Sequence, residues 1–554
     1  MIRDAATAPP RASFREATAR RRLLGLLDPG TVVEALGPAE RVTSPHLAAL
    51  GLPTAFDDGV VVAEGRLEGA PVLAASGEGG FMGGSVGEVH GAKLVGLLRR
   101  ARRVRPRGVV LLLDSGGVRL QEANAGLVAV SEVMRAVLDT RAAGIPVVGL
   151  VGGGWDCFGG MGIVARCCDT IAMSEEGRLG LSGPDVVEAT KGVEELDASD
   201  RALVWRTYGG KHRFILGEAD LLVDDDVAAF RAAAVELLGR PRPISEATLA
   251  REHALLAARL ARAGGCADAA DVWRVAGAAE PERLPLLDAA AFRAAAGGTR
   301  RALAAEGAVA EEPLGAGSAY RDPGLDALFP RGHTVREAAG ILRGSGRAEG
   351  GEVAVVGSAG GAEVGVEAAL ALAAEVLRVV REHPGRPLLA LVDSRGQRMS
   401  RRDELLGVNG YLGHLAAAVE LARQRGHRVV GLLRGDAVSG GVLPLGFMAD
   451  DVDALEGANP WVMALPAMAR VTKIPAERLE ELSRTSPVLA PGLDGFLRLG
   501  AIGTVWRPPL DVALAAALAR PREPDRRAER GLTRGGRLLA AAVADSVAGG
   551  ADAR

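Results

Sequence analysis

The segment LLLDSGGVRLQE, residues 111–122, places two glycines directly after a continuous apolar run, an aspartate and a serine. The segment ALVDSRGQRMSRRDE, residues 390–404, repeats this order of apolar run, Asp-Ser, glycine and a charged tail. A short apolar run that ends in a polar turn is typical of a strand buried on both faces of a parallel sheet. The repetition indicates that one structural unit occurs twice in the chain.

Each copy contains two such apolar runs with a segment of helical apolar spacing between them. Strands joined by helices predict βαβ units and a parallel sheet covered by helices on both faces. The expected strands are residues 109–114, 147–153, 388–393 and 429–435, and the expected helices are residues 122–144 and 404–426.

A glycine pair follows the second apolar run of each copy. Asp114 precedes the pair at 159–160 by 45 residues, and Asp393 precedes the pair at 440–441 by 47 residues. An apolar helical stretch and a short strand are expected after each pair. The matched spacing predicts two homologous α/β domains. We place them at residues 1–300 and 301–554.

Composition narrows the class of protein. The 554 residues carry a net charge of −3, which argues against general affinity for nucleic acid. The four cysteines form no CxxC pair, and no histidine lies at ligand spacing from them, so neither a zinc site nor a disulfide framework is expected. Charge or glycine interrupts every long apolar run, and the first residues do not resemble a signal peptide. We therefore expect a cytoplasmic protein without membrane attachment.

The glycine turns are candidates for oxyanion holes. Backbone amides next to glycine can approach a bound oxygen closely, because glycine has no Cβ atom. A helix that begins at the turn adds a partial positive charge. A tight turn without further function is the alternative for either pair. Phosphate binding is less favoured, because neither GxGxxG nor GxxxxGKS/T occurs in a strand-turn-helix context.

Longer segments resemble one family. DSGGVRLQE (114–122) and GDAVSGG (435–441) are similar to turns in the carboxyltransferase branch of the crotonase superfamily. Four further segments resemble the β and γ subunits of biotin-independent malonate decarboxylase, fused in that order. The resemblance extends from about Ser13 to Ile502, and the four segments are residues 83–93, 177–205, 402–415 and 465–475.

The resemblance implies a fold and a reaction. The fold would be two tandem crotonase-like carboxyltransferase domains, each a ββα spiral. The reaction would be decarboxylation of a malonyl thioester to an acetyl thioester and CO2, within a multisubunit complex. The thioester would be carried on the dephospho-CoA-derived arm of a separate acyl carrier protein, with no covalently bound cofactor, no biotin and no metal. An acyl-carrier transferase subunit would be a second partner, and the chain itself would form a dimer or larger oligomer.

The resemblance also implies roles for the glycine turns. The thioester oxygen would be bound by amides around Gly159 and Gly160, with help from Gly116 and Gly117. A second hole would face the first across the domain interface and hold the malonyl carboxylate or the departing CO2. Which hole holds which oxygen is open at this stage, as is whether the site forms within one chain or between two. The second hole is formed by Ser439, Gly440 and Gly441.

Charged residues near the turns are candidates for substrate binding. The run RRARRVRPR (99–107) contains six arginines, which suit a phosphate-bearing arm or an acidic carrier. A solvated helix end is the alternative for this run. Glu122 and Glu404 could orient a loop or relay a proton, and a carboxylate at a helix start is the simpler reading. The substrate-binding candidates are Arg119, Glu122, Arg398, Arg102 and Arg103.

Three other residue types have a simpler structural reading. Asp114 and Asp393 at strand ends are expected to be turn residues. Cys157 beside the glycine pair is expected to be a small buried apolar group, because no histidine is close to it in sequence. His90 is a weak candidate for the proton donor to the enolate.

Three alternative functions remain open. A biotin-dependent acyl-CoA carboxyltransferase would share the fold, although no zinc ribbon and no Met-Lys-Met biotin site occur here. A crotonase-like peptidase would use Ser439 as a nucleophile and would need a lysine base, for which Lys93, Lys191 or Lys211 are available. A scaffold that only binds the carrier is the third alternative.

Overall fold

The computed structural model describes residues 12–304 and 314–550. The first half of the chain forms a seven-stranded sheet in which the strands follow one another in sequence order. Strands β3 to β7 are parallel, as the sequence predicts, but β1, β2 and β3 pair antiparallel. Glu68 and Gly69 both have positive φ, which is the geometry of a two-residue hairpin turn between β2 and β3. The strands are β1 (Val33–Ala35), β2 (Val60–Leu67), β3 (Ala70–Gly77), β4 (Val109–Leu113), β5 (Val147–Val151), β6 (Thr170–Ser174) and β7 (Leu221–Val223).

The second half repeats this plan in a nine-stranded sheet. An antiparallel hairpin, β10 and β11, is again followed by parallel strands, β12, β13 and β14. The duplication predicted from the glycine spacing is therefore visible as two sheets of the same topology. The strands are β8 (Ser318–Ala319), β9 (Arg336–Ala338), β10 (Ile341–Ala348), β11 (Gly351–Ser358), β12 (Leu388–Ser394), β13 (Val429–Val438), β14 (Asp451–Leu455), β15 (Asn459–Trp461) and β16 (Val505–Trp506).

The helices between the central strands also correspond in the two halves. The helix predicted at 122–144 is confirmed as α4 (Ala123–Ala142), but the one predicted at 404–426 is broken into α15 (Arg401–Leu406) and α16 (Val408–Gln424). The break is at Gly407, whose φ is +76°, and a Cβ there would overlap the carboxyl group of Glu218. A glycine with positive φ is a common end of a helix, and here it also lets Glu218 of the first half approach the break.

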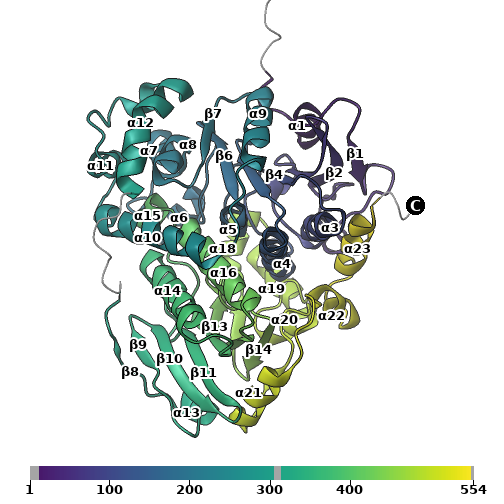
Figure 1. Cartoon of the computed structure of the whole chain (residues 1–554). Coiled ribbons are helices and arrows are strands. Elements are labelled where there is room, and N and C mark those ends of the chain that lie inside the picture. The colour runs from purple at the N-terminus through teal and green to yellow at the C-terminus, as the bar shows by residue number, and fades with distance from the viewer. Residues whose placement is uncertain (1–11, 305–313, 551–554) are drawn as a thin grey trace, which may run out of the picture.

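The two halves share one hydrophobic core. In Figure 1 the sheets lie on opposite sides of a layer of helices that includes α4, α5 (Gly160–Cys167) and α16. These three helices contact one another, and a single cluster of buried apolar side chains extends from β4 in the first half to β13 in the second. Two smaller clusters fill the outer faces of the two sheets. The halves are therefore joined by packing as well as by the chain.

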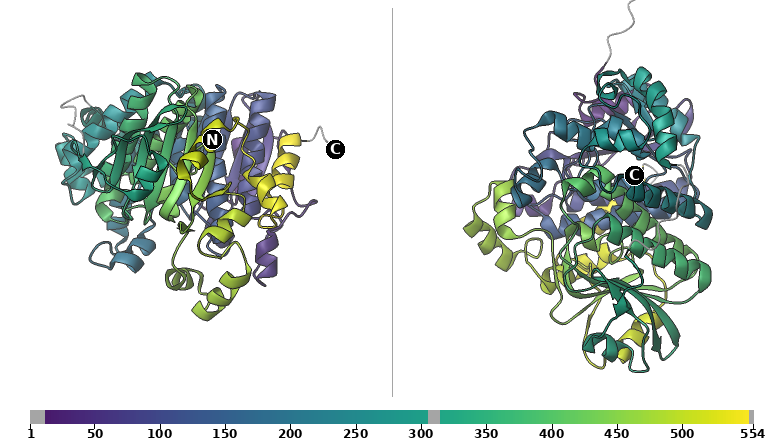
Figure 2. Two further views of the ribbon diagram at one scale, coloured as in Figure 1. Left: turned by 90° about the horizontal axis from the view of Figure 1, so that it is seen from below. Right: turned by 90° about the vertical axis from the view of Figure 1, so that its left-hand side faces the viewer.

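The end of the chain returns to the first half. Figures 1 and 2 show α23 (Ala540–Gly549) beside α3 (Glu88–Val104). Gly96 allows the two helices to approach, because a Cβ there would lie 2.6 Å from the carbonyl oxygen of Ala544. The Glu88 carboxylate accepts hydrogen bonds from the amides of Leu539 (2.6 Å) and Ala540 (2.8 Å) at the start of α23. Sequence-distant segments are thus fastened together at this face.

Helices make up most of the remaining chain, including the region around 266–304, where strand signals are weak. No helix within residues 12–304 and 314–550 combines the length and the apolar character needed to cross a membrane. The remaining helices are α1 (Ala19–Leu26), α2 (Pro45–Ala49), η1 (Met82–Gly84), α6 (Pro184–Lys191), α7 (Arg201–Tyr208), α8 (Gly210–Leu216), α9 (Val227–Leu238), α10 (Glu246–Ala263), α11 (Ala269–Val275), η2 (Leu284–Leu286), α12 (Ala289–Ala304), α13 (Pro323–Leu328), α14 (Val366–Glu382), α17 (Ser439–Val442), α18 (Leu465–Thr472), α19 (Ala476–Thr485), α20 (Leu493–Arg498), α21 (Leu510–Ala519) and α22 (Arg527–Thr533).

Candidate active site

The first glycine turn brings together two segments that are 42 residues apart, as the difference between Gly117 and Gly159 gives. A Cβ on Gly117 would lie 2.9 Å from the Cα of Gly159, and a Cβ on Gly159 would lie 2.8 Å from the Cα of Gly117. Both residues have positive φ, +101° and +60°. Glycine is therefore required at both positions by backbone geometry as well as by contact.

The amides of this turn differ in their hydrogen bonding. Gly116 donates to the carbonyl oxygen of Gly83 (2.8 Å), and Gly159 donates to that of Leu181 (2.7 Å). Gly117 donates to the Oγ of Ser115 (3.2 Å). Gly160 is the first residue of α5, where helical amides have no acceptor within the helix, and no acceptor for it occurs among residues 12–304 and 314–550. Of the four predicted donors, Gly160 is therefore the one with an open amide, meaning an amide without a hydrogen-bond acceptor in the described part of the chain.

The second glycine turn has the same backbone form. Ser439, at the end of β13, has φ +46°, which matches Gly159 with φ +60°. The next residue, Gly440, donates its amide to Oε1 of Gln397 at 3.1 Å. A Cβ on Gly441 would lie 2.7 Å from the Cα of Gly396. In the second half, Gly440 corresponds to Gly160, and its amide already donates a hydrogen bond to a side-chain carbonyl oxygen.

The two turns approach each other within one chain. A Cβ on Gly160 would lie 3.4 Å from Leu443, two residues beyond the second glycine pair. A Cβ on Gly440 would lie 3.5 Å from Leu181, whose carbonyl holds the amide of Gly159. Each turn thus contacts an apolar residue that lies next to the other turn.

Arg119 and Glu122 lie behind the first turn and face no open space. Both side chains are fully buried, and Arg119 pairs with Asp58 (2.8 Å) and Glu122 (2.7 Å). Arg119 also donates to the carbonyl oxygen of Ser85 (3.0 Å), and Glu122 accepts from the Ser44 hydroxyl (2.8 Å). Both residues therefore have an internal structural role, and contact with substrate stays a prediction. They hold the 115–118 loop against the start of α3.

Arg398 is the counterpart of Arg119 in the second half. Each arginine follows the strand-end aspartate, Asp114 or Asp393, by five residues. Arg398 pairs with Asp403 at 2.9 Å and with Glu367, but its side chain is 36% exposed. The same motif is thus buried in one half and partly open to solvent in the other.

The arginine run at 99–107 holds the end of the chain in place. Arg103 donates to the carbonyl oxygen of Gly549 (2.6 Å), and Arg100 donates to the same oxygen (3.1 Å). Arg102 lies 3.4 Å from Asp139. These contacts fasten α23 and α4 to α3, and substrate binding by Arg102 and Arg103 stays a prediction.

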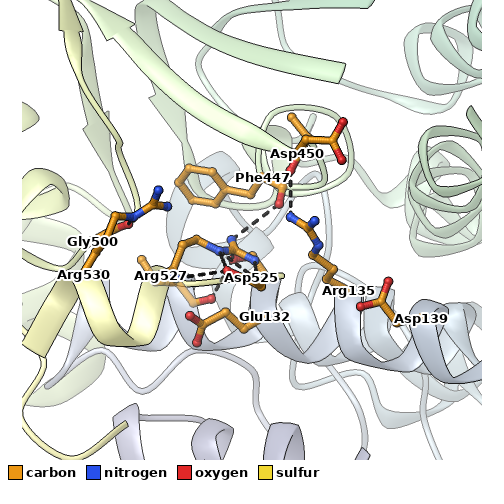
Figure 3. Close-up of polar contacts among 12 residues, drawn as sticks. Glu132, Arg135, Asp139, Phe447, Asp450, Gly500, Asp525, Arg527 and Arg530 are labelled. Atoms are coloured by element: carbon orange, nitrogen blue, oxygen red, sulfur yellow. Dashed lines mark hydrogen bonds and ion pairs between the residues drawn. The ribbon is translucent and has the colours of Figure 1, made fainter. Parts of the chain in front are cut away.

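A second set of charges joins the halves deeper in the molecule (Figure 3). Arg527 donates to the Ser131 hydroxyl on α4 at 2.7 Å and pairs with Asp525. Burial alone would raise the pKa of Asp525, but Arg527 keeps it below its usual value. Arg135 on α4 donates to the carbonyl oxygen of Ala449 at 2.9 Å. The position of α4 relative to the second half is therefore fixed by charged contacts on both sides.

The simpler readings of Asp114, Asp393 and Cys157 are confirmed. Asp114 accepts from the amide of Trp155 (2.7 Å), and Asp393 accepts from that of Gly360 (2.8 Å), so both stabilise turns. Cys157 is fully buried, and burial raises the pKa of its thiol well above the usual value. Burial also lowers the pKa of His90 well below its usual value. A neutral, buried imidazole is a poor proton donor.

Thiol labelling tests this burial directly. Burial raises the pKa of all four thiols, but Cys157, Cys167 and Cys168 are buried whereas Cys266 is half-buried. We expect a maleimide to modify the native chain at Cys266 only, because the thiolate is the reactive form and the other three thiols are shielded. Peptide mass spectrometry reports the positions. Modification of Cys157 in native protein would contradict the described packing of the first turn.

Comparison with known proteins connects this geometry with a family. Residues 15–247 match the carboxyl transferase domain, and residues 359–551 match the malonate decarboxylase gamma subunit. The chain is 42% identical over 294 residues to malonyl-S-ACP:biotin-protein carboxyltransferase MADC of Malonomonas rubra, covering 49% of this chain and 92% of that protein. The chain belongs to the malonate decarboxylase family of carboxyltransferases. Both types of subunit predicted from the resemblance are therefore represented in one polypeptide.

Two further relatives of this malonate decarboxylase chain are informative. MADD of Malonomonas rubra, also named as a malonyl-S-ACP:biotin-protein carboxyltransferase, is 35% identical over 148 residues, which are 25% of this chain and 51% of that protein. A chain in the crystal structure of a Pseudomonas malonate decarboxylase hetero-tetramer with malonate is 40% identical, with a TM-score of 0.44 over 48% of this chain and 98% of that chain.

Sequence reasoning did not identify every residue that shapes the turns. Leu181 lies in an ordinary loop sequence, and only the structure shows its carbonyl on the Gly159 amide. The sequence does contain a signal for Gln397. It follows Asp393 by four residues, and the corresponding position of the first half, four residues after Asp114, is Val118. A polar residue in one copy and an apolar one in the other marks the two turns as chemically different.

Proposed function

We propose that this chain is the fused β and γ component of a malonate decarboxylase and that it decarboxylates a malonyl thioester to an acetyl thioester and CO2. The observation that carries the proposal is the pair of glycine turns, one from each half, that approach each other through Leu443 and Leu181. Membership of the malonate decarboxylase family supports the reaction class. The substrate is the thioester rather than free malonate.

The chemistry needs few side chains. When the bond between the carboxylate carbon and the α-carbon breaks, its electron pair forms an enolate of the thioester, and a proton then adds to the α-carbon. The protein has to hold the carboxylate out of the carbonyl plane and stabilise the enolate oxygen. The open amide of Gly160 at the start of α5 supplies a donor and a helix N-terminus for that oxygen. One such donor contributes about 3 kcal/mol to transition-state binding.

The two turns have different tasks in this proposal. The first turn takes the thioester oxygen, because the Gly160 amide is open. The second turn, Ser439 to Gly441, takes the malonyl carboxylate or the CO2 that leaves. The amide oxygen of Gln397, which accepts the Gly440 amide at 3.1 Å, marks the place of a ligand oxygen there. Binding of the carboxylate requires the Gln397 side chain to turn away.

The partners follow from the same proposal. A separate acyl carrier protein presents the malonyl group on its dephospho-CoA-derived arm, and a transferase subunit loads that arm. The chain acts in the cytoplasm, as an oligomer, without biotin and without a metal. The relative MADC is named for a malonyl-S-ACP substrate, and the Pseudomonas enzyme is a hetero-tetramer, which supports a multisubunit setting.

A second candidate function is carboxyl transfer from the malonyl group to biotin on a carrier protein. The printed names of MADC and MADD favour it, since both are malonyl-S-ACP:biotin-protein carboxyltransferases. The peptidase alternative has no support from the lysines. Lys93 and Lys211 are held by backbone carbonyl oxygens, and Lys191 lies 3.7 Å from Glu363.

Release of CO2 in the presence of avidin separates the two candidates. We expect the purified chain to convert malonyl carrier protein to acetyl carrier protein at the same rate with and without avidin, because the thioester itself accepts the electron pair. Acyl-carrier mass and CO2 are measured together. Activity that disappears with avidin, or that requires an added biotin protein, would instead establish carboxyl transfer to biotin.

A further inference from the structure

We propose that Glu404, in the second half of the chain, is a positioning residue that sets the open amide of the first glycine turn. The inference rests on the proposed function, since it assigns the catalytic amide to Gly160. It adds a contact between the halves on which the geometry of that amide depends.

Two successive amides of the first half converge on this one carboxylate. Glu404 is fully buried at the end of α15, and its Oε1 accepts from the amide of Ser182 at 2.6 Å. Its Oε2 accepts from the amide of Leu181 at 3.0 Å. An ionised carboxylate has the acceptor capacity for both amides, whereas most side chains do not.

The Leu181 segment in turn holds the glycine turn. The carbonyl oxygen of Leu181 accepts from the amide of Gly159 at 2.7 Å. The amide of Gly180 donates to the carbonyl of Cys157 at 3.1 Å, and the amide of Cys157 donates to the carbonyl of Arg178 at 2.9 Å. Backbone hydrogen bonds therefore join residues 178–181 to residues 157–159, so that a displacement of one segment displaces the other. Gly159 directly precedes Gly160, so a shift at Leu181 changes the direction of the Gly160 amide.

Against the larger effect of burial, the charge of Arg213 lowers the pKa of this carboxylate, but Arg213 forms no ion pair with it. Arg213 on α8 donates to the backbone oxygen of Glu404 at 2.8 Å, but its guanidinium pairs with Glu218 at 3.0 Å. Tyr208 on α7 donates to the carbonyl oxygen of Ser182 at 3.0 Å. Within residues 12–304 and 314–550 no cation forms an ion pair with the Glu404 carboxylate. A buried carboxylate held only by neutral amides is unfavourable to keep ionised and is typical of functional sites.

This environment makes the contact sensitive to pH. The charged and titratable groups that face Glu404 are Arg213, Tyr208 and its neighbour Asp403, and burial raises the pKa of Glu404 to about 7. Protonation turns one oxygen into an O–H donor, so one of the two amides loses its acceptor. The folding stability depends on pH in the opposite direction. Because the folded pKa is raised, the stabilising effect of the protonated form is lost as the pH rises through about 7.

The test compares wild type with Glu404→Gln in the full chain, using malonyl carrier protein as substrate. Glutamine keeps one acceptor and directs an NH2 group at the other amide. We expect kcat to fall about tenfold with KM unchanged, which corresponds to one weakened transition-state contact. We also expect the acidic limb of the kcat profile, with its midpoint near pH 7 in wild type, to disappear in the variant. The melting temperature at pH 8.5 is expected to be no lower than that of wild type.

Glu132→Gln is the matched control, because Glu132 is also a buried carboxylate that joins the halves, through Arg537 at 2.6 Å. This control is expected to lose stability and to keep kcat. Amide hydrogen exchange supplies a readout that does not need activity. Glu404→Gln is expected to speed exchange in residues 157–161 and 178–182, and Glu132→Gln is expected to leave these segments unchanged.

The outcomes separate the two proposals. A wild-type chain that releases no CO2 overturns the proposed function, while the exchange experiment still decides the role of Glu404. Glu404→Gln with wild-type kcat and wild-type exchange at residues 157–161 overturns the positioning role. A loss of kcat that parallels a loss of melting temperature, as for any destabilised variant, also overturns it.

Discussion

Replacement of Gly160 with valine is expected to lower kcat by about 100-fold or more. A Cβ at this position would lie 2.5 Å from Cγ1 of Val130 on α4 and 3.4 Å from Leu443 of the second half. Valine adds two methyl groups to that Cβ, so the first turn of α5 has to move away from both side chains. The amide that we assign to the enolate oxygen moves with it. Steady-state CO2 release from malonyl carrier protein measures the effect.

Two further variants show whether the loss of kcat depends on the size and the position of the added side chain. Gly160→Ala adds only the Cβ and is expected to give an intermediate loss of kcat. Gly265→Ala is the control, because a Cβ at Gly265 meets no atom within 4 Å, and its kcat should equal that of wild type. Circular dichroism confirms that the variants are folded before rates are compared. Undiminished turnover by folded Gly160→Val would remove this amide from the mechanism.

Replacement of Arg119 with leucine is expected to lower the free energy of unfolding by about 3–5 kcal/mol. The substitution leaves Asp58 and Glu122 without their shared cation, and all three side chains are fully buried. Burial already raises the pKa of Asp58 to about 6, and loss of Arg119 raises it further. The loss of stability is therefore expected to be larger at pH 8 than at pH 5.5, where protonation of Asp58 relieves part of it. Denaturant titrations at the two pH values measure this difference.

The duplicated motif supplies the control for Arg119. Arg398→Leu removes the corresponding arginine of the second half, whose side chain is 36% exposed. Arg402 still pairs with the buried Asp403 at 3.2 Å, and solvent screens the charge of Arg398, so we expect a cost of about 1 kcal/mol or less. Equal losses for the two variants would contradict the assignment of different burial to the two copies.

Local sequence patterns predicted the repeated parts of the fold well. Continuous apolar runs identified β4, β5, β12 and β13, and helical spacing identified α4. The break at Gly407 was missed, although glycine with positive φ is a common helix end, and the approach of Glu218 from the other half could not be predicted. The antiparallel hairpins β2–β3 and β10–β11 were missed as well, because the apolar patterns identified only the parallel strands that follow them.

The candidate site was predictable to the level of residue type but not of role. The contact between the turn at Gly117 and the turn at Gly159 follows from strand ends that share one edge of a sheet. The roles of the charged residues near the turns depend on whether their side chains are buried, and burial is a property of the whole fold. Arg119 looks the same in sequence whether it meets a substrate or Asp58. Glu404 and Leu181 are 223 residues apart, so nothing local connects them.

The return of α23 to α3 has a consequence for synthesis of the protein. A ribosome makes the chain from its first residue, and α3 with its partner strands emerges long before residues 540–549. Until those residues are released, Glu88 lacks the amides of Leu539 and Ala540, and the surface at Gly96 is open to water. The first half therefore reaches its final form only after residues 539–549 have also been made. A nascent chain stalled before residue 540 is expected to expose this helix to chaperones and proteases, although every residue of the first half has been made.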